Sequence, residues 1–285
     1  YGDEVFEWAP DPQPYYDTDG VTQLGWTMPE ENLTLKISAT PQTYKLALDA
    51  DEHSGEPIVY LDGSATPAVP NADGTYDVMF GQNVSLTTTA ATGYTVGGWA
   101  VSYVDKNYAT KKVTTSNVGS LYSFPMPAGD TTAKIESTGN TFTIVYMSDS
   151  ADAKTPSTYD PANSTRYTQT VTYGDATAMV MNQFERAGYS FVGWSDESGG
   201  DASFLNGGSA KNLTAEANGT VYRYAVWKAN TYQVVYNANG GEGAQMAATP
   251  VDFGSDVTLS ANTYARAGYK FYAWNTQADG LGTDY

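Results

Sequence analysis

One string recurs three times at long intervals, and it constrains the fold more than any other feature. It reads ATGYTVGGW at 91–99, RAGYSFVGW at 186–194 and RAGYKFYAW at 266–274. The glycines align at 93, 188 and 268, and a tryptophan follows each of them six residues later. A fainter copy, GVTQLGW at 20–26, keeps the same separation. Such a string is either a recognition surface or the core of a repeated module.

Three further elements recur in the same order around this string. An opening segment reads TYKLAL at 43–48, TFTIVY at 141–146 and TYQVVY at 231–236. An aromatic–glycine element reads FGQNVSL at 80–86, YGDATAM at 173–179 and FGSDVTL at 253–259. A closing segment reads MPEENLTLKI at 28–37, MPAGDTTAKI at 126–135 and, more loosely, NGTVYRYAVW at 218–227. The chain is therefore predicted to be a tandem array of one module.

The spacing of the opening segments sets the size of the module. Their first threonines are 98 and 90 residues apart, which is domain-sized and longer than a solenoid repeat of roughly 20–50 residues. This frame predicts the C-terminal part of a repeat at 1–40, complete repeats at 41–138 and 139–229, and the N-terminal part of a repeat at 230–285. The 41–138 repeat has long loops at 49–79 and 100–125.

Both the opening and the closing segments alternate with period two, which predicts strands with one buried face. In the opening strand Phe142, Ile144 and Tyr146 are expected to point to the core. In the closing strand Tyr222, Tyr224 and Val226 share a face, and they correspond to Leu33, Leu35 and Ile37. A cation recurs between these positions at Lys36, Lys134 and Arg223. We expect these cations at solvated outward positions, each beside a carboxylate.

The recurrent tryptophan is interpreted as core, with exposure of some rings for ligand contact as the alternative. Burial of one such ring contributes on the order of 4–6 kcal/mol, which a module with few leucines and no cysteines needs. The tryptophan recurs wherever the unit recurs, as core requirements do, whereas binding determinants more often lie in variable loops. The glycine before the tyrosine is expected to enter the strand through a turn. The glycine before the tryptophan leaves space or marks a bulge.

No segment shows helical periodicity over three turns. A short helix fits only in 174–187 or in a loop after an opening strand. The expected fold class is mainly β, or small α+β: tandem modules, each a small mixed sheet with at most one short helix.

Composition excludes several classes of function. With 14 basic and 32 acidic side chains the formal charge is −18, which opposes binding to nucleic acid or to an anionic bilayer. The absence of cysteine removes disulfides, thiolate metal sites and a cysteine nucleophile. The sequence contains neither a membrane span nor a signal peptide, so direct membrane insertion is not expected. Because the chain starts at Tyr1, it is expected to be a piece of a longer protein.

No motif points to catalysis, and no catalytic, cofactor-binding or metal-ligating residue is assigned. The single histidine, His53, is expected to be an ordinary exposed loop residue. Acidic clusters are taken as solvated loops rather than calcium sites, at Asp17 and Asp19, at Asp49, Asp51 and Glu52, and at Asp196, Glu197 and Asp201. A phosphate-cradling glycine loop and a serine elbow are both missing. The chain is therefore predicted not to be an enzyme and to need no cofactor.

The recurrent strings resemble the Listeria–Bacteroides repeat family, the B repeat of internalins. The resemblance is close over 231–285, from YNANGG to RAGYKFYAW, and clear over 141–227, which ends in YRYAVW. It is partial over 43–135, where Ala91 and Val96 replace the arginine and phenylalanine of the pattern, and faint over 1–37. The resemblance implies a β-grasp-like module found in tandem on bacterial surface proteins, and it brings no catalytic residues.

Three hypotheses follow for function. The first is a non-catalytic stalk or spacer, with a role in adhesion, on the surface of a bacterial cell or in a secreted protein. The alternative is a carbohydrate- or host-protein-binding module that uses exposed loop aromatics, with the candidates Tyr60, Tyr76, Tyr103, Tyr108 and Tyr122. An enzyme whose catalytic domain lies elsewhere comes last. Neighbouring repeats are expected partners of one another, and the incomplete terminal repeats predict weak head-to-tail self-association, unless their limits are arbitrary.

Overall fold

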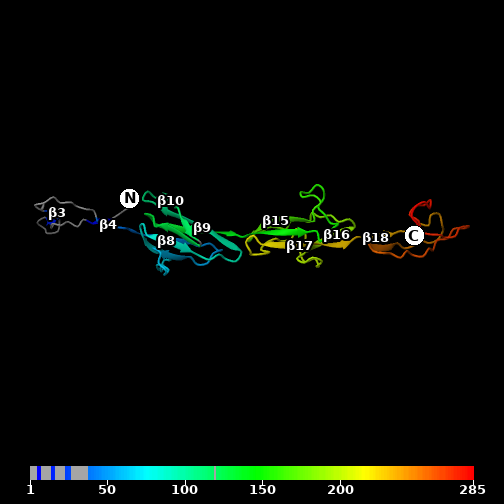
Figure 1. The fold of residues 1–285 in the computed structure, drawn as a ribbon, viewed down its shortest axis with the longest axis horizontal. Helices are drawn as coiled ribbons and strands as arrows, with labels where there is room; N and C mark the ends of the chain where they lie inside the picture. The colour runs from blue at the N-terminus through cyan, green and yellow to red at the C-terminus, as the bar shows by residue number, and fades with distance from the viewer. Residues whose placement is uncertain (1–4, 8–13, 17–22, 27–37, 119) are drawn as a thin grey trace. The chain divides into compact units, whose positions relative to one another are not determined.

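The computed structural model describes residues 5–7, 14–16, 23–26, 38–118 and 120–285. The chain divides into two units, residues 1–140 and 141–285, and each is described by itself. Within the described ranges all regular structure is β-strand (Figure 1), which confirms the predicted mainly-β class. The short helix allowed at 174–187 does not form. No helix of the described residues has the length and apolar character needed to cross a membrane.

The first unit begins with two strand pairs. β1 (Val5–Glu7) pairs with β4 (Ser38–Thr40), and β2 (Pro14–Tyr16) pairs with β3 (Gln23–Trp26), both antiparallel. The side chains of Lys36, Asp17 and Asp19, on which the sequence made predictions, lie outside the described residues.

The rest of the first unit consists of two sheets. The five-stranded sheet has the order β10-β9-β13-β5-β7, and its members are β5 (Thr43–Asp49), β7 (Tyr76–Met79), β9 (Tyr94–Val104), β10 (Thr110–Val113) and β13 (Thr131–Gly139). The four-stranded sheet has the order β11-β12-β8-β6, and its members are β6 (Ile58–Leu61), β8 (Asn83–Thr87), β11 (Ser116–Val118) and β12 (Leu121–Pro125). The first sheet is mixed, because β13 runs parallel to β5 and antiparallel to β9.

Side chains from both sheets of the first unit form one hydrophobic core. Leu46, Trp99 and Ile135 come from the five-stranded sheet, and Leu86 and Phe124 come from the four-stranded sheet. The segments expected as long loops, 49–79 and 100–125, therefore contain strands that build this second layer. The sequence missed them because each strand is only three to five residues long and is separated from its neighbours by turns.

The second unit contains one four-stranded sheet with the order β15-β14-β17-β16. Its strands are β14 (Thr141–Met147), β15 (Arg166–Thr172), β16 (Tyr189–Ser195) and β17 (Thr220–Ala229). The two central strands, β14 and β17, are parallel, and both outer strands are antiparallel to their neighbours. The small mixed sheet predicted from the opening and closing segments is thus confirmed.

One face of this sheet carries the core, and irregular segments cover it. Phe142, Ile144 and Tyr146 are at most 1% exposed, as their alternation predicted. Met179 and Phe184 from the segment predicted as a possible helix pack against them. That segment is extended instead, because its backbone pairs with another loop, through Met179 N–H to Gly208 O (2.7 Å) and Ala210 N–H to Thr177 O (2.9 Å).

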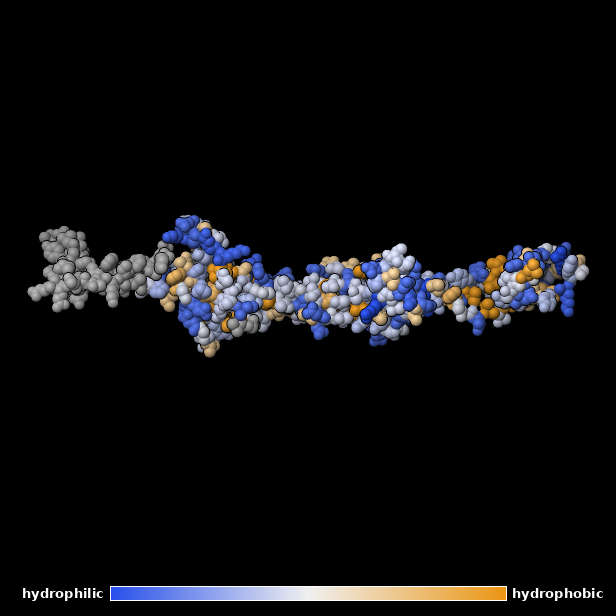
Figure 2. Space-filling view, turned by 45° about the horizontal axis from the view of Figure 1, so that its top comes forward, coloured by the Kyte–Doolittle hydropathy of each residue, from blue (hydrophilic) through white to orange (hydrophobic). Residues whose placement is uncertain are grey.

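The last part of the second unit has less regular structure. β18 (Thr231–Val234) pairs with β19 (Thr249–Asp252) in a two-stranded sheet. Tyr236 is buried as predicted, but Tyr232 is half exposed. Hydrophobic surface gathers at this end of the chain (Figure 2), where Val235 and Tyr269 are about 70% exposed.

Candidate functional site

The recurrent tryptophans lie in the cores. Trp99 is 5% exposed and Trp194 is fully buried, so the core interpretation is confirmed for both. Trp194 lies among rings of the second unit, 4.9 Å from Tyr146 and 4.9 Å from Phe191 between centroids. Trp274 is half-buried, and its Nε1 donates to Ser260 O.

A β-bulge aims the tryptophan inward. Between β16 and β17 the register shifts at Phe191–Gly193, so that Val192 is the extra residue, and between β9 and β13 the shift leaves Gly97 extra. The added residue changes the alternation, so Phe191 and Trp194 both face the core although they are three residues apart. Gly193 gives the backbone of Phe204 room to pair with Trp194, since a β-carbon would lie 2.8 Å from Phe204 O. Both roles proposed for this glycine are therefore present.

The glycine before the tyrosine is a turn residue in every described copy, as predicted. Its φ is +83° at Gly93, +78° at Gly188 and +81° at Gly268. A single asparagine that follows the closing strand is fixed to this turn. Asn140 N–H donates to Gly93 O, and Asn230 N–H donates to Gly188 O. The next opening strand starts at the following residue in both cases.

In the second unit this turn is also the joint between two successive repeats. The ring of Phe253, from the aromatic–glycine element of the last repeat, packs on the backbone of Gly188. It meets Tyr189 edge-on at 5.7 Å, and Phe253 N–H donates to Asn230 O. Arg186 stacks on the other motif ring, with its guanidinium 3.7 Å from the Tyr189 centroid. In this copy of the motif the tryptophan packs in the core of its own repeat, and the Gly–Tyr turn packs against the next repeat.

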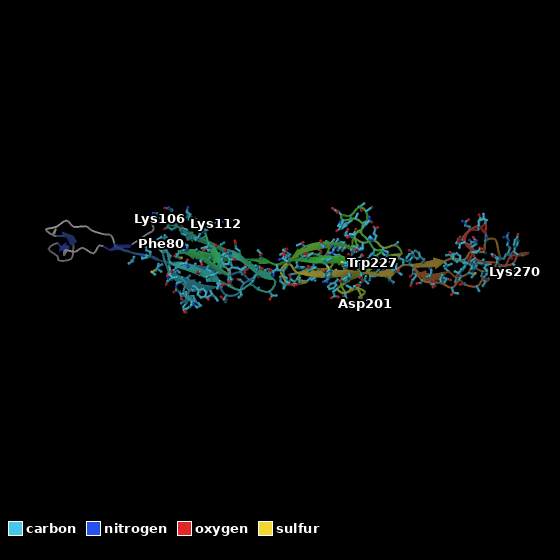
Figure 3. The ribbon with its side chains drawn as sticks, in the orientation of Figure 1. Phe80, Lys106, Lys112, Asp201, Trp227 and Lys270 are labelled. Atoms are coloured by element: carbon cyan, nitrogen blue, oxygen red, sulfur yellow. The ribbon has the colours of Figure 1, made fainter. Side chains whose placement is uncertain are left out.

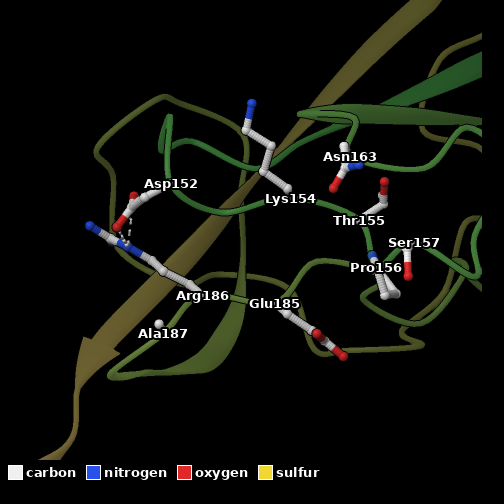
Figure 4. Close-up of a pocket in the computed structure, with 9 residues that line it drawn as sticks. All are labelled: Asp152, Lys154, Thr155, Pro156, Ser157, Asn163, Glu185, Arg186 and Ala187. Carbon is white, nitrogen blue, oxygen red and sulfur yellow. Dashed lines mark hydrogen bonds and ion pairs between the residues drawn. The ribbon is translucent and has the colours of Figure 1, made fainter.

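An open depression of about 590 Å³ lies beside this joint (Figure 4). It is lined by two segments, 152–163 and 185–187. Its ion pair is between Arg186 and Asp152 (3.2 Å), and hydrogen bonds from Ser150 and Arg186 hold the pKa of Asp152 below its usual value. The Lys154 and Glu185 side chains point to different sides (Figure 4), while their backbones pair with each other. The hydroxyl of Thr155 is already bonded to Pro161 O.

The tyrosines predicted as exposed loop rings differ widely. Tyr76 is only 8% exposed and belongs to the core, so that candidate was wrong. Tyr60, Tyr103 and Tyr122 are half-buried, and Tyr122 OH donates to Gly97 O. Tyr108 is 92% exposed in the turn between β9 and β10. Lys106 and Lys112 belong to the same hairpin (Figure 3). Of the five candidates only Tyr108 offers a free ring.

The polar residues noted in the sequence are mostly structural. His53 is half-buried and stacks on Tyr94 at 3.8 Å, rather than being fully solvated as expected. Asp51 accepts hydrogen bonds from the backbone N–H groups of His53 and Ser137. Burial raises the pKa of Asp51, but the hydrogen bonds from Ser137, His53 and Ser54 outweigh it and leave this pKa below its usual value. Within the described ranges, His, Asp and Glu do not gather in threes that could hold a metal ion.

Arg223 contradicts its predicted outward position. It is 5% exposed, with its guanidinium 3.9 Å from the Phe204 centroid, and it has no carboxylate within ion-pair distance among the described residues. One nitrogen donates to Tyr222 O, whereas Nε has no partner among them. Burial lowers the pKa of Arg223. Lys134, by contrast, is exposed and lies 3.6 Å from Asp49, as expected.

The reason for the error is a slip of register in the sequence comparison. Tyr146 pairs with Arg223 in β17, and the residue in the equivalent position of β13 is Ala133, not Lys134. Because side chains alternate along a strand, one residue of slip moves a cation from solvent to core. The same slip places Tyr222, Tyr224 and Val226 on the outer face of the sheet.

Comparison with known proteins agrees with the recurrent motifs. The profile of the Listeria-Bacteroides repeat domain family matches residues 157–222 and 232–285. Two relatives come from the bacterium Evansella cellulosilytica. One, provisionally named a membrane protein, is 33% identical over 105 residues, which are 35% of this chain and 15% of the relative. The other, provisionally named a Gly-rich membrane protein, is 30% identical over 118 residues, which are 37% of this chain and 12% of the relative.

These matches span only a small part of the relatives' length. Both segments that match the family lie in the unit 141–285, where the motifs, the mixed sheet and the joint have been described. Two tandem segments of the chain therefore match the Listeria-Bacteroides repeat domain, as its motifs predicted.

Proposed function

We propose that this chain is part of a non-catalytic stalk of a bacterial cell-envelope protein, in which tandem repeats act as a stiff spacer. The repeat family and the membrane-protein names of the two bacterial relatives support an envelope location. The formal charge of −18 suits a solvated extracellular protein. A role in adhesion is part of the same proposal.

The observation that carries the spacer role is the joint between residues 139–229 and 230–285. One residue, Asn230, separates strand β17 from strand β18. Its N–H donates to Gly188 O, and its C=O accepts a hydrogen bond from Phe253 N–H. The Phe253 ring on the Gly188–Tyr189 turn adds packing to these hydrogen bonds. A linker of one bonded residue removes most of the freedom that longer polar linkers have.

The joint can be tested by distance measurement, because a cysteine-free chain accepts unique labels. Spin labels at Thr168→Cys and Asp279→Cys, both exposed positions, report the separation of the two repeats. A narrow distance distribution is expected in the parent, and Phe253→Ala should broaden it. Tyr272→Ala, which removes an 88% exposed ring away from the joint, is the matched control. A broad distribution in the parent, or one that Phe253→Ala leaves narrow, would refute the stiff spacer.

A further inference from the structure

The sheet of residues 139–229 carries apolar and aromatic side chains on its outer face as well as in its core. This face points away from the core, and its side chains come from the two central strands and from the bulge. We name this set the outer face; it consists of Val145, Met147, Val192, Tyr222, Tyr224 and Val226. Tyr222 is 47% exposed and Val192 is 52% exposed.

Two tyrosines give the outer face its shape. Tyr222 and Tyr224 are two residues apart in β17, so both project to the same side. Their rings are nearly parallel, at 22°, with centroids 6.2 Å apart. Val145 and Met147 lie directly across from them in β14. The result is a pair of nearly parallel rings next to aliphatic side chains on one face of the sheet.

The fold does not require this aromatic pair, because the first unit lacks it. In the five-stranded sheet the equivalent positions are Ala47, Thr132, Lys134 and Glu136, and Lys134 is paired with Asp49. That sheet folds with a charged outer face. The buried tryptophan is present in both of these sheets, whereas the aromatic pair is present in the second and not in the first.

Charge narrows the chemistry of a partner. None of the outward-facing residues of β14, β15, β16 and β17 is Asp or Glu, although the chain has 32 carboxylates. Arg166 and Lys228 stand at the ends of this face, and Thr168 and Thr170 line its side. The charged side chains on this face are therefore cationic. The face offers hydroxyl and cationic hydrogen-bond donors around two rings.

We propose that the outer face is a binding platform for an extended glycan, with Tyr222 and Tyr224 contacting its sugar rings. A sugar ring has an apolar C–H face, which fits a tyrosine ring, and a rim of hydroxyls, which fits the threonines and the two cations. A stable protein partner would need about 800 Å² on each side, more than six side chains present. This assignment goes beyond the spacer role and moves the expected aromatic site from the loops to the sheet.

The test is isothermal titration of the whole chain with chitohexaose and, separately, with cellohexaose. At least one should bind, and Tyr222→Ala and Tyr224→Ala should each weaken that binding by about tenfold or more. Tyr222→Phe and Tyr224→Phe keep the stacking ring and should retain most of the affinity. Tyr108→Ala removes an even more exposed ring from the β9–β10 hairpin and should change nothing.

The following results would refute glycan binding at the outer face. If neither hexasaccharide binds the parent chain, no glycan of this class is recognised. If the alanine variants bind like the parent, or if Tyr108→Ala weakens binding as much as they do, the site is not the outer face. Thermal melting of each variant separates loss of a contact from loss of fold. The spacer role is unaffected by any of these outcomes, because its distance measurement does not involve the outer face.

Discussion

Phe253 occupies the space that a side chain on residue 188 would need: a β-carbon built on Gly188 would lie 2.3 Å from Phe253 Cδ1. The turn glycine of one repeat is thus part of the surface on which the aromatic–glycine element of the next repeat packs. A position that must be glycine both for its positive φ and for this contact couples the fold of one repeat to the placement of its neighbour.

The first prediction separates these two demands on glycine. Gly188→Ala should destabilise the second unit more than Gly268→Ala does. Both glycines have φ near +80°, so both variants carry the same backbone strain of about 1 kcal/mol or more. Only residue 188 has a ring against it, since nothing lies within 4 Å of a β-carbon at residue 268. Urea denaturation measures both, and equal losses would show that the Phe253 contact contributes nothing.

The second prediction concerns the recurrent tryptophan. Trp194→Ala should cost about 3–5 kcal/mol, because it empties a fully buried site among aromatic rings. Trp194→Phe should cost less, since most of the contacts with Tyr146 and Phe191 remain. Trp274→Ala should also cost less, as that ring is half-buried. Chemical denaturation measures the free energy of unfolding of each variant. A larger loss of stability for Trp274→Ala than for Trp194→Ala would contradict the assignment of Trp194 to the core.

Sequence patterns sufficed where a regular period was not interrupted. The inward face of β14, the turn at each Gly–Tyr and the burial of Trp99 and Trp194 all follow from alternation and from glycine chemistry. The joint was not predicted, because its two halves, Gly188 and Phe253, belong to different repeats and each looks like an ordinary turn residue. The one signal in the sequence was the short junction at Asn230, because the next opening strand starts at the following residue.

Errors arose where alternation changed phase. A loosely matched closing strand shifted the inferred register of β17 by one residue, which reversed the predicted positions of Arg223 and Tyr224. Tyr76 was mistaken for a loop residue because the short strand β7 is surrounded by turns. No local signal in the sequence distinguishes such a strand, since its partner β5 lies about 30 residues earlier.

The third prediction tests the buried guanidinium. Arg223→Met should leave the free energy of unfolding unchanged or raise it by about 1 kcal/mol or more. The substitution removes a buried charge that has no carboxylate within ion-pair distance among the described residues, and it keeps much of the packing against Phe204. Arg223→Lys keeps the charge but loses the planar contact with the ring, and it should destabilise. Lys134→Met, at an exposed position, should lie within about 0.5 kcal/mol of the parent. If methionine proves worse than lysine at residue 223, the charge itself stabilises the fold.

The fourth prediction is a loss of stability of the second unit in alkali. Burial raises the pKa of Tyr146 to about 12, although a hydrogen bond from Val180 and the charge of Arg223 oppose it, and burial also raises the pKa of Tyr167. A raised pKa means that folding favours the neutral phenol. The resulting stability is complete below pH 10 and is lost as the pH rises toward 12. The ultraviolet absorbance of tyrosinate should therefore rise together with unfolding, and titration of all tyrosines without unfolding would refute the assignment.

The fifth prediction returns to the expected head-to-tail association. Among the described strands β18 has β19 as its single partner, whereas β14 lies between β15 and β17. Residues 269–274, which match β16 in sequence, form no strand. An edge with free backbone groups and exposed apolar side chains pairs with other chains. Light scattering over a concentration series should therefore show weak association. Val235→Lys, which puts a charge beside this edge, should reduce it, while Val69→Lys, at an 86% exposed valine of the first unit, should not. A strictly monomeric parent at high concentration would show that the edge is protected, and the terminal repeat would then have to be stable without a partner strand.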